Sequence, residues 1–149
     1  MVDKSLVNKI YTTGRDILDL EIFKNGYKQV HHKNTNVSNH CIRVCYISLS
    51  ICKKFSLRVD EERLIRGALF HDIGIIGRYS KYKNDFICCF KHPIDSYKIY
   101  VRNFGEDKII KDIVTHHMFP LVFIPMHTKE AFIVSVADKL AHFQEFFRK

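Results

Sequence analysis

Apolar side chains recur at helical spacing along most of this chain. Over residues 4–23 they fall at Leu6, Ile10, Ile17 and Leu20. These positions share one face of a helix with about 3.6 residues per turn. The pattern predicts an amphipathic helix running through residues 4–23.

Capping residues and breakers delimit the next helices. Residues 30–39 are polar and are predicted to form a loop, and Ser38 is expected to cap a helix that runs to about residue 55. Its apolar face would hold Ile42, Cys45, Leu49 and Cys52. Asp60 is expected to cap a further helix, with Gly74 just past its end.

The second half of the chain continues in the same way. A polar loop is predicted over residues 79–85, and Pro93 suits the first turn of a helix, which predicts a helix from there to residue 104. Another helix is expected over residues 106–117. Two prolines in residues 119–125 indicate a non-helical connection, and Thr128 is expected to cap a final helix of about twenty residues.

These elements amount to about six helices with short connections, and no hairpin signal interrupts them. The predicted fold class is therefore all-α, a compact helical bundle. A chain of 149 residues with 46% hydrophobic residues suits a packed core, and we expect one domain over residues 1–149.

The charge balance narrows the partners. Lys and Arg number 24 against 16 Asp and Glu, a formal charge of +8. Such a balance suits phosphates, nucleotides or nucleic acid. Because the basic residues are dispersed, we interpret the charge as steering toward small anions, with a solvated lysine-rich surface as the alternative. The chain has no apolar run of the roughly 18 residues that span a membrane and no export signal, so a cytoplasmic protein without a membrane partner is expected.

The five cysteines do not indicate a zinc site. Cys41, Cys45 and Cys52 fall within one helical pattern, Cys88 and Cys89 are adjacent, and no C-x-x-C spacing occurs. Buried reduced thiols are therefore predicted.

Asp138 is the first residue that calls for chemistry. Its predicted helix is apolar almost all round, at Phe132, Ile133, Val134, Val136, Ala137, Leu140 and Ala141. A helix of this kind is expected to be buried, and a buried carboxylate must be neutralised, paired or bound to a cation. The neighbouring Lys139 points elsewhere on a helix, so the alternatives are a distant basic partner or a metal ion.

Several histidines lie at predicted helix ends. His71-Asp72 closes one helix, His40 opens another, His92 precedes Pro93, and the pair His116-His117 ends a third. Each alone is more often structural. Helix ends can converge on one cavity in a bundle, and imidazoles with carboxylates suit one or two divalent ions, namely Fe, Mn, Ni, Co or Zn.

The order of these residues resembles a known family. His40, His71-Asp72 and Asp138 match the H…HD…D pattern of the HD-domain phosphohydrolase superfamily, with "HDIG" at residues 71–74 and "ADK" at residues 137–139. The intervening His92-Pro93 and His116-His117 resemble the dinuclear subset that includes the HD-GYP phosphodiesterases. The segment "HMFPL" at residues 117–121 is similar to an element of small stand-alone HD proteins of Firmicutes, which implies a bacterial protein.

The resemblance implies a metal-dependent hydrolase of phosphate esters with two metal ions. By that analogy the first ion is held by His40, His71, Asp72 and Asp138. Asp72 would bridge to a second ion held by His92, His117 and His116. The implied catalytic residues are His71 and Asp72, and the implied nucleophile is a metal-bridging hydroxide that attacks phosphorus.

Two departures bear on the substrate. The "GYP" triplet is replaced by Met118-Phe119-Pro120, and the lysine after "HDIG" is replaced by Ile75. Both argue against cleavage of cyclic dinucleotides, which leaves a nucleotide or a phosphate monoester as the expected substrate. A silent metal-binding or ligand-binding module and a basic nucleic-acid-binding domain remain the alternatives. The candidates for holding the substrate are His32, Lys33, Arg43 and Arg78.

Overall fold

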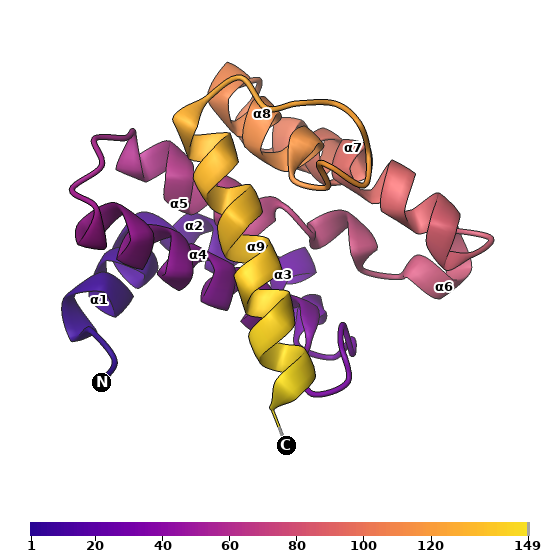
Figure 1. The fold of residues 1–149 in the computed structure, drawn as a ribbon. Helices are drawn as coiled ribbons and strands as arrows, with labels where there is room; N and C mark the ends of the chain where they lie inside the picture. Colours follow the sequence, from indigo (N-terminus) through magenta and orange to yellow (C-terminus); the bar gives the residue numbers. More distant parts are fainter. Residues whose placement is uncertain (149) are drawn as a thin grey trace.

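The computed structural model describes residues 1–148 as a set of helices (Figure 1). They are α1 (Lys4–Thr13), α2 (Arg15–Leu18), α3 (Glu21–Gly26), α4 (Val37–Lys54), α5 (Glu61–Phe70), the 3₁₀ helix η1 (Ile73–Ile75), α6 (Arg78–Lys81), α7 (Asp85–Phe104), α8 (Lys108–His116) and α9 (Lys129–Phe147). Among the described residues β-pairing is limited to one isolated bridge, between Val30 and Asn36. The predicted all-α class is confirmed.

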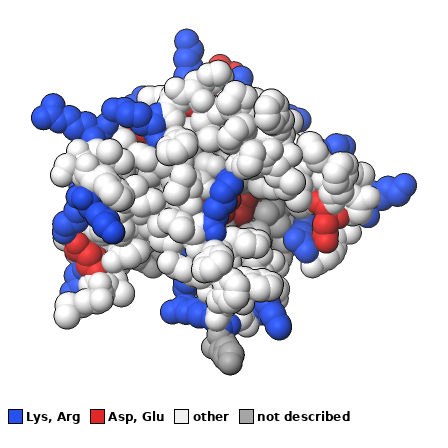
Figure 2. Space-filling model, viewed as in Figure 1, with Lys and Arg blue, Asp and Glu red and all other residues white. Residues whose placement is uncertain are grey.

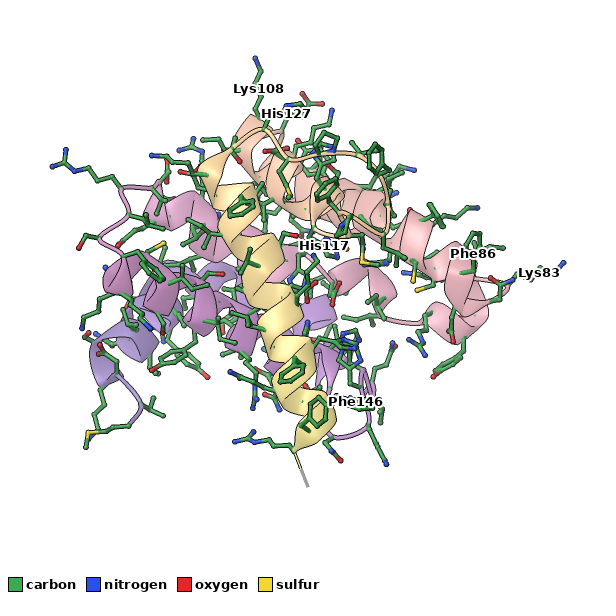
Figure 3. The ribbon with its side chains drawn as sticks, in the orientation of Figure 1. Lys83, Phe86, Lys108, His117, His127 and Phe146 are labelled. Carbon is green, nitrogen blue, oxygen red and sulfur yellow. The ribbon has the colours of Figure 1, made fainter. Side chains whose placement is uncertain are left out.

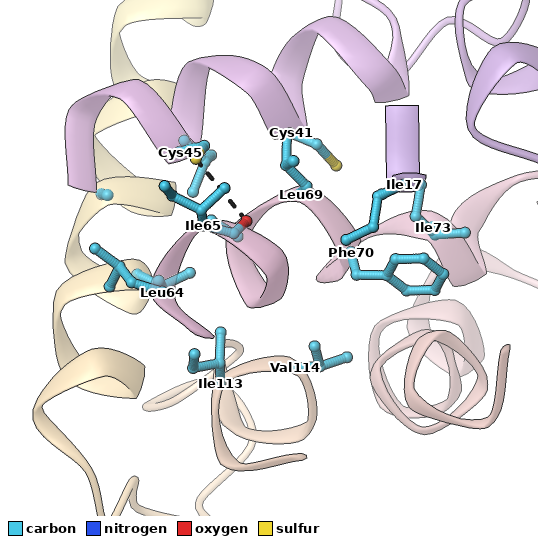
Figure 4. Close-up of a cluster of buried hydrophobic side chains, with 14 of the residues drawn as sticks. Ile17, Cys41, Cys45, Leu64, Ile65, Leu69, Phe70, Ile73, Ile113 and Val114 are labelled. Atoms are coloured by element: carbon cyan, nitrogen blue, oxygen red, sulfur yellow. Dashed lines mark hydrogen bonds between the residues drawn. The ribbon is translucent and has the colours of Figure 1, made fainter. Parts of the chain in front are cut away.

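The core forms where the long helices meet. Helix α4 packs against both α5 and α9, α8 packs against α5, α7 and α9, and η1 packs against α7. Figure 1 shows α9 crossing the face of the molecule nearest the viewer. Figure 4 shows the apolar cluster between α4, α5 and α8, where the Cys45 thiol lies 3.9 Å from the Ile65 carbonyl oxygen. All five cysteines are free, as predicted, and only Cys89 is not fully buried.

The N-terminal segment folds as three helices, so the prediction of one continuous helix is wrong. Helix α1 ends at Gly14, whose N–H donates to the Ile10 carbonyl, and the chain restarts as α2 and α3. The expected inward side chains are nevertheless buried: Ile10 and Ile17 are 1% and 0% exposed. The apolar spacing identified the inward face, but it did not show the breaks.

The start of α4 also differs from the prediction. Asn36 is the N-cap, and its side chain accepts a hydrogen bond from the Asn39 N–H at 2.8 Å. Ser38 lies inside the first turn, where its hydroxyl donates to the Phe23 carbonyl at 2.5 Å and ties α4 to α3. The caps predicted at Asp60 and Thr128 are confirmed.

Pro93 does not begin a helix. It lies inside α7, which starts after the N-cap Asn84. His92 is therefore a mid-helix residue, with its Nδ1 atom 2.7 Å from the Cys88 carbonyl oxygen. The predicted loop over residues 79–85 is partly the short helix α6.

Gly74 brings η1 against α7. A Cβ atom at this position would collide with the His92 carbonyl oxygen and with Ser96. The Gly74 N–H donates to the Ser96 hydroxyl at 2.7 Å. The glycine is therefore required by a close approach between two helices, and it lies inside η1 rather than just past the end of α5.

Helix α9 is buried on one face only, so the prediction of a wholly buried helix is wrong. Ala137 and Ala141 are 0% exposed, whereas Phe132 and Leu140 are 59% and 45% exposed. None of the helices within residues 1–148 is both long and apolar enough to cross a bilayer.

Candidate metal centre

The carboxylate of Asp72 lies among five imidazoles. Its Oδ2 atom is 3.2 Å from His31 Nε2, 3.3 Å from His71 Nε2 and 3.5 Å from His40 Nε2. Its Oδ1 atom is 3.1 Å from His92 Nε2 and 3.2 Å from His117 Nε2. Each oxygen of one buried side chain thus faces a different set of imidazole nitrogens.

Asp138 adds a second carboxylate to the first of these sets. Its Oδ1 atom lies 2.9 Å from His40 Nε2 and 3.5 Å from His71 Nε2. Across residues 1–148 it forms no ion pair with a lysine or arginine, and the Lys139 ammonium donates instead to the His117 carbonyl and the Ser135 side chain. The distant basic partner considered from the sequence is therefore absent.

Two groups of possible ligands result, which share Asp72. The first is His40, His71, Asp72 and Asp138, and the second is Asp72, His92 and His117. Within each group the ligand atoms all lie within 4.8 Å of one another. The side chains come from α4, the end of α5, α7, the end of α8 and α9, and Figure 3 shows His117 beside the middle of α9.

Backbone carbonyls orient three of these imidazoles. The Nδ1 atoms of His71, His92 and His117 lie 2.7, 2.7 and 2.8 Å from the carbonyl oxygens of Ala68, Cys88 and Val114. A carbonyl oxygen can only accept, so each Nδ1 carries the hydrogen. In the neutral form each Nε2 atom therefore presents a lone pair to the interior of the site, which is the tautomer that a metal ion requires.

This arrangement fits a divalent cation. His92 Nε2 and His117 Nε2 are 3.1 Å apart, and both are close to Asp72 Oδ1, so three acceptors face one another. His71 Nε2 is buried without a hydrogen-bond partner. A positive charge between these atoms would satisfy them all, and imidazole with carboxylate is a common donor set for Fe, Mn, Ni, Co and Zn.

In the metal-free chain, protons take the place of that charge. Burial would lower the pKa of His40, but its contacts with Asp138 and Glu145 raise the pKa to about 10. Burial likewise opposes the charged form of His92, yet Asp72 and the Cys88 carbonyl raise its pKa to about 9. Despite burial, the surrounding imidazoles hold the pKa values of Asp72 and Asp138 well below their usual range.

Two residues of the site were missed by the sequence analysis. The carboxylate of Glu145, only 2% exposed, lies 2.9 Å from His40 Nδ1. It is two helical turns beyond Asp138 on α9, and this spacing could have identified it. His31 contacts Asp72 directly, but nothing in its local sequence distinguishes it from the adjacent His32.

His116 lies outside both groups. Its Nδ1 atom is 2.6 Å from Asp112 Oδ1, in an ion pair at the end of α8. The structure therefore does not bring His116 to the second group, although His117 is there.

The four candidates for holding the substrate are spread around the molecule. His32 stacks close to His31, with ring centroids 3.8 Å apart, and its Nε2 atom lies 3.0 Å from His142 Nδ1. Arg43 contacts Glu145 at 3.5 Å, behind His40. Lys33 borders a groove between α1 and α4, and Arg78 contacts Asp85 on α7. Their roles toward a substrate stay predictions.

Comparison with known proteins supports the resemblance seen in the sequence. Residues 37–142 match the family described as HD domain. Searches of curated proteins and of solved structures returned no match. The matched residues include His40, the His71-Asp72 pair and Asp138, which the fold brings together. Because the match covers well over half of the chain, the protein belongs to the HD-domain family.

Proposed function

We propose that this protein is a metal-dependent hydrolase of phosphate esters that holds two divalent cations. The HD-domain family is in general one of metal-dependent phosphohydrolases, which supports the reaction class. The observation that carries the proposal is the placement of Asp72, with one oxygen toward each of two groups of imidazole nitrogens.

The charge of such a site suits a phosphate. Two divalent cations bring four positive charges against the two carboxylates of Asp72 and Asp138. Glu145 is balanced by His40 and Arg43. The remaining positive charge lies in a mostly buried cavity, where it attracts a phosphate dianion more strongly than it would in water.

Bound cations would supply an acidified water and positive charge against the phosphoryl oxygens. The chain's own contribution is orientation. The carbonyl contacts of His71, His92 and His117 fix the imidazole rings before any ligand arrives. The Asp138 side chain is 17% exposed whereas that of Asp72 is 6% exposed, so substrate would approach from the side of α9.

The test combines metal analysis with an assay. We expect purified protein, prepared without chelators, to carry close to two equivalents of transition metal. It should hydrolyse phosphate esters in a screen of esters and nucleotides with Mn, Fe, Ni, Co and Mg. The Asp72→Asn variant should lose hydrolysis and retain less metal, because one oxygen of the shared carboxylate becomes an amide.

A matched control is Asp95→Asn, which alters a half-buried aspartate that accepts from the Tyr82 hydroxyl, outside both groups. It should keep both metal and activity. Protein that binds two ions but hydrolyses no ester would favour the silent module over the hydrolase. Protein that binds no transition metal would refute the proposal.

A further inference from the structure

A cavity of about 660 Å³ lies directly beside the candidate metal centre. His117 and Asp138 form part of its wall, so it continues outward from both ligand groups. The rest of the wall is mostly apolar and consists of Met118, Pro120, Leu121, Phe143, Phe146 and Phe147. Figure 3 shows His117 beside the middle of α9 and Phe146 near its C-terminal end.

The apolar wall of this cavity is unusually exposed. Phe143, Phe147 and Leu121 are 63%, 64% and 68% exposed. Figure 2 shows the same face, and its middle carries few charged side chains although the formal charge is +8. Apolar surface gathered in a hollow beside reactive groups is typical of a small-molecule site, and the volume lies within the usual range of about 300–1,000 Å³.

The polar groups at the cavity are already engaged. The Lys139 ammonium donates to Ser135 Oγ at 2.8 Å and to the His117 carbonyl at 3.1 Å. His142 Nδ1 contacts His32 at 3.0 Å. A group that fills this space would therefore find aromatic and aliphatic contacts but few free hydrogen-bonding partners. A nucleobase, whose edge must be hydrogen-bonded when it is buried, suits this wall poorly.

We propose that this cavity receives the organic part of the phosphate ester and that this part is an apolar, ring-sized group. The inference rests on the proposed function, because the phosphate would have to lie at the cations for the organic group to reach Phe143 and Phe147. Continuity between the cavity and the two ligand groups favours a small ester over a second protein chain as the occupant. It names the substrate class as aryl or similarly apolar phosphate monoesters rather than nucleotides.

A binding measurement tests this without turnover. The probes are 1-naphthylmethylphosphonate, which cannot be hydrolysed, and methylphosphonate, which lacks the ring. Calorimetry with the Mn-loaded protein should show that the naphthyl compound binds at least tenfold more tightly, the advantage expected of a filled apolar pocket. The Phe143→Ala variant should lose roughly tenfold of that affinity without affecting methylphosphonate.

Phe132→Ala is the matched control. Phe132 is on the same helix and is 59% exposed, close to the 63% of Phe143, but it does not line the cavity. It should leave the binding of both compounds unchanged. Both phenylalanines are exposed, so both variants should fold, which circular dichroism can check.

Hydrolysis separates this inference from the function on which it rests. Wild-type protein should favour 1-naphthyl phosphate over methyl phosphate and AMP in kcat/KM, and Phe143→Ala should remove much of that preference. Equal binding of the two phosphonates, or equal losses in Phe143→Ala and Phe132→Ala, would overturn the inference while hydrolysis could still stand. A wild-type dimer in sedimentation that Phe143→Ala converts to monomer would also overturn it, because the cavity would then be a contact between copies.

Discussion

At the residue scale, each imidazole of the site is defined by the partner of its Nδ1 atom. His71, His92 and His117 use neutral backbone carbonyls, whereas His40 uses the carboxylate of Glu145. A carboxylate partner makes the opposite nitrogen a stronger ligand than a carbonyl does. His40 should therefore be the imidazole whose strength as a ligand depends most on a single charged side chain.

Glu145→Gln tests that dependence. The amide oxygen can still accept from His40, but the negative charge is lost. We expect metal affinity to fall by roughly 10–100-fold with little loss of fold, measured by competition with a chelating dye. The exposed Glu62→Gln is the control, and an equal affinity in both variants would argue against a role for Glu145 in positioning His40.

Most of the site could be predicted from the sequence at this scale, and the reason for each failure is physical. Asp138 stood out because a carboxylate in an apolar helix needs a positive partner. His31 and Glu145 did not stand out, because one lies in a polar loop and the other near the end of a helix that also carries exposed residues. His116 and His117 are adjacent, and only the turn of the chain after α8 decides which one faces Asp72.

At the scale of elements, the contact between η1 and α7 places Asp72 opposite His92. Gly74 makes this contact possible, and its carbonyl accepts from the Tyr82 hydroxyl at 3.0 Å and from the Lys81 ammonium at 2.8 Å. A side chain at this position must push the two helices apart, because the atoms it meets are largely backbone.

Gly74→Ala should therefore reduce both stability and metal affinity. Forcing a methyl group into such a contact costs about 1–3 kcal/mol, measurable by urea unfolding. Gly105→Ala is the comparison, because Gly105 has open space around it but a φ of +85°. That variant should lose stability through backbone strain while keeping its metal affinity, and a similar loss of affinity in both would contradict the argument.

A second joint connects α8 to the start of α9. Asp112 Oδ2 accepts from the His127 N–H at 2.9 Å and from the Thr128 N–H and hydroxyl at 2.7 Å each. Burial opposes its charge, yet these donors and His116 hold the pKa of the Asp112 carboxyl below its usual value. The folded chain thus favours the ionised form more than the unfolded chain does.

The sign of the pH dependence follows. The stabilisation is present above the unfolded-state pKa of about 3.9 and is lost as the pH falls through the lower folded-state pKa. Asp112→Asn should therefore be less stable than wild type at pH 7, with the difference shrinking toward pH 3. Chemical unfolding at both values measures it, and a difference independent of pH would show that the charge has no part in the effect.

Helix boundaries were the weakest part of the sequence analysis. Pro93 was assigned to a first turn because its missing N–H is harmless there, but the same residue is accommodated within α7. Its position there is decided by packing of α7 on η1 and α8, which local sequence does not reveal. The caps at Asp60 and Thr128 were predicted correctly because a side-chain oxygen and a nearby N–H form a strictly local contact.

At the scale of the whole molecule, the candidate site joins distant parts of the chain. His40 and Asp138 are 98 residues apart in sequence yet 2.9 Å apart in space. The all-α class and the HD-domain family could be predicted, because helical spacing and the order of the motif are features of the sequence. The outward apolar face of α9 could not, because spacing alone does not distinguish a helix covered on every side from one that borders a cavity.

A cation that binds only the folded chain must stabilise it. At a free metal concentration 100 times the Kd, the gain is about 2.7 kcal/mol, which corresponds to roughly 5–10 °C in Tm for a chain of this size. Differential scanning fluorimetry with and without Mn²⁺ measures the shift, and a chelator should reverse it. Asp72→Asn should show a much smaller shift, and equal shifts in both proteins would indicate binding elsewhere.

The position of α9 has a consequence for biosynthesis. Asp138 and Glu145 both lie on this helix, which follows every other described element along the chain. A nascent polypeptide still attached to the ribosome can form α4, α5, α7 and α8 while both carboxylates remain in the exit tunnel. Loading with metal is therefore a late event, and a translation product arrested before α9 should emerge helical but unable to capture the ions.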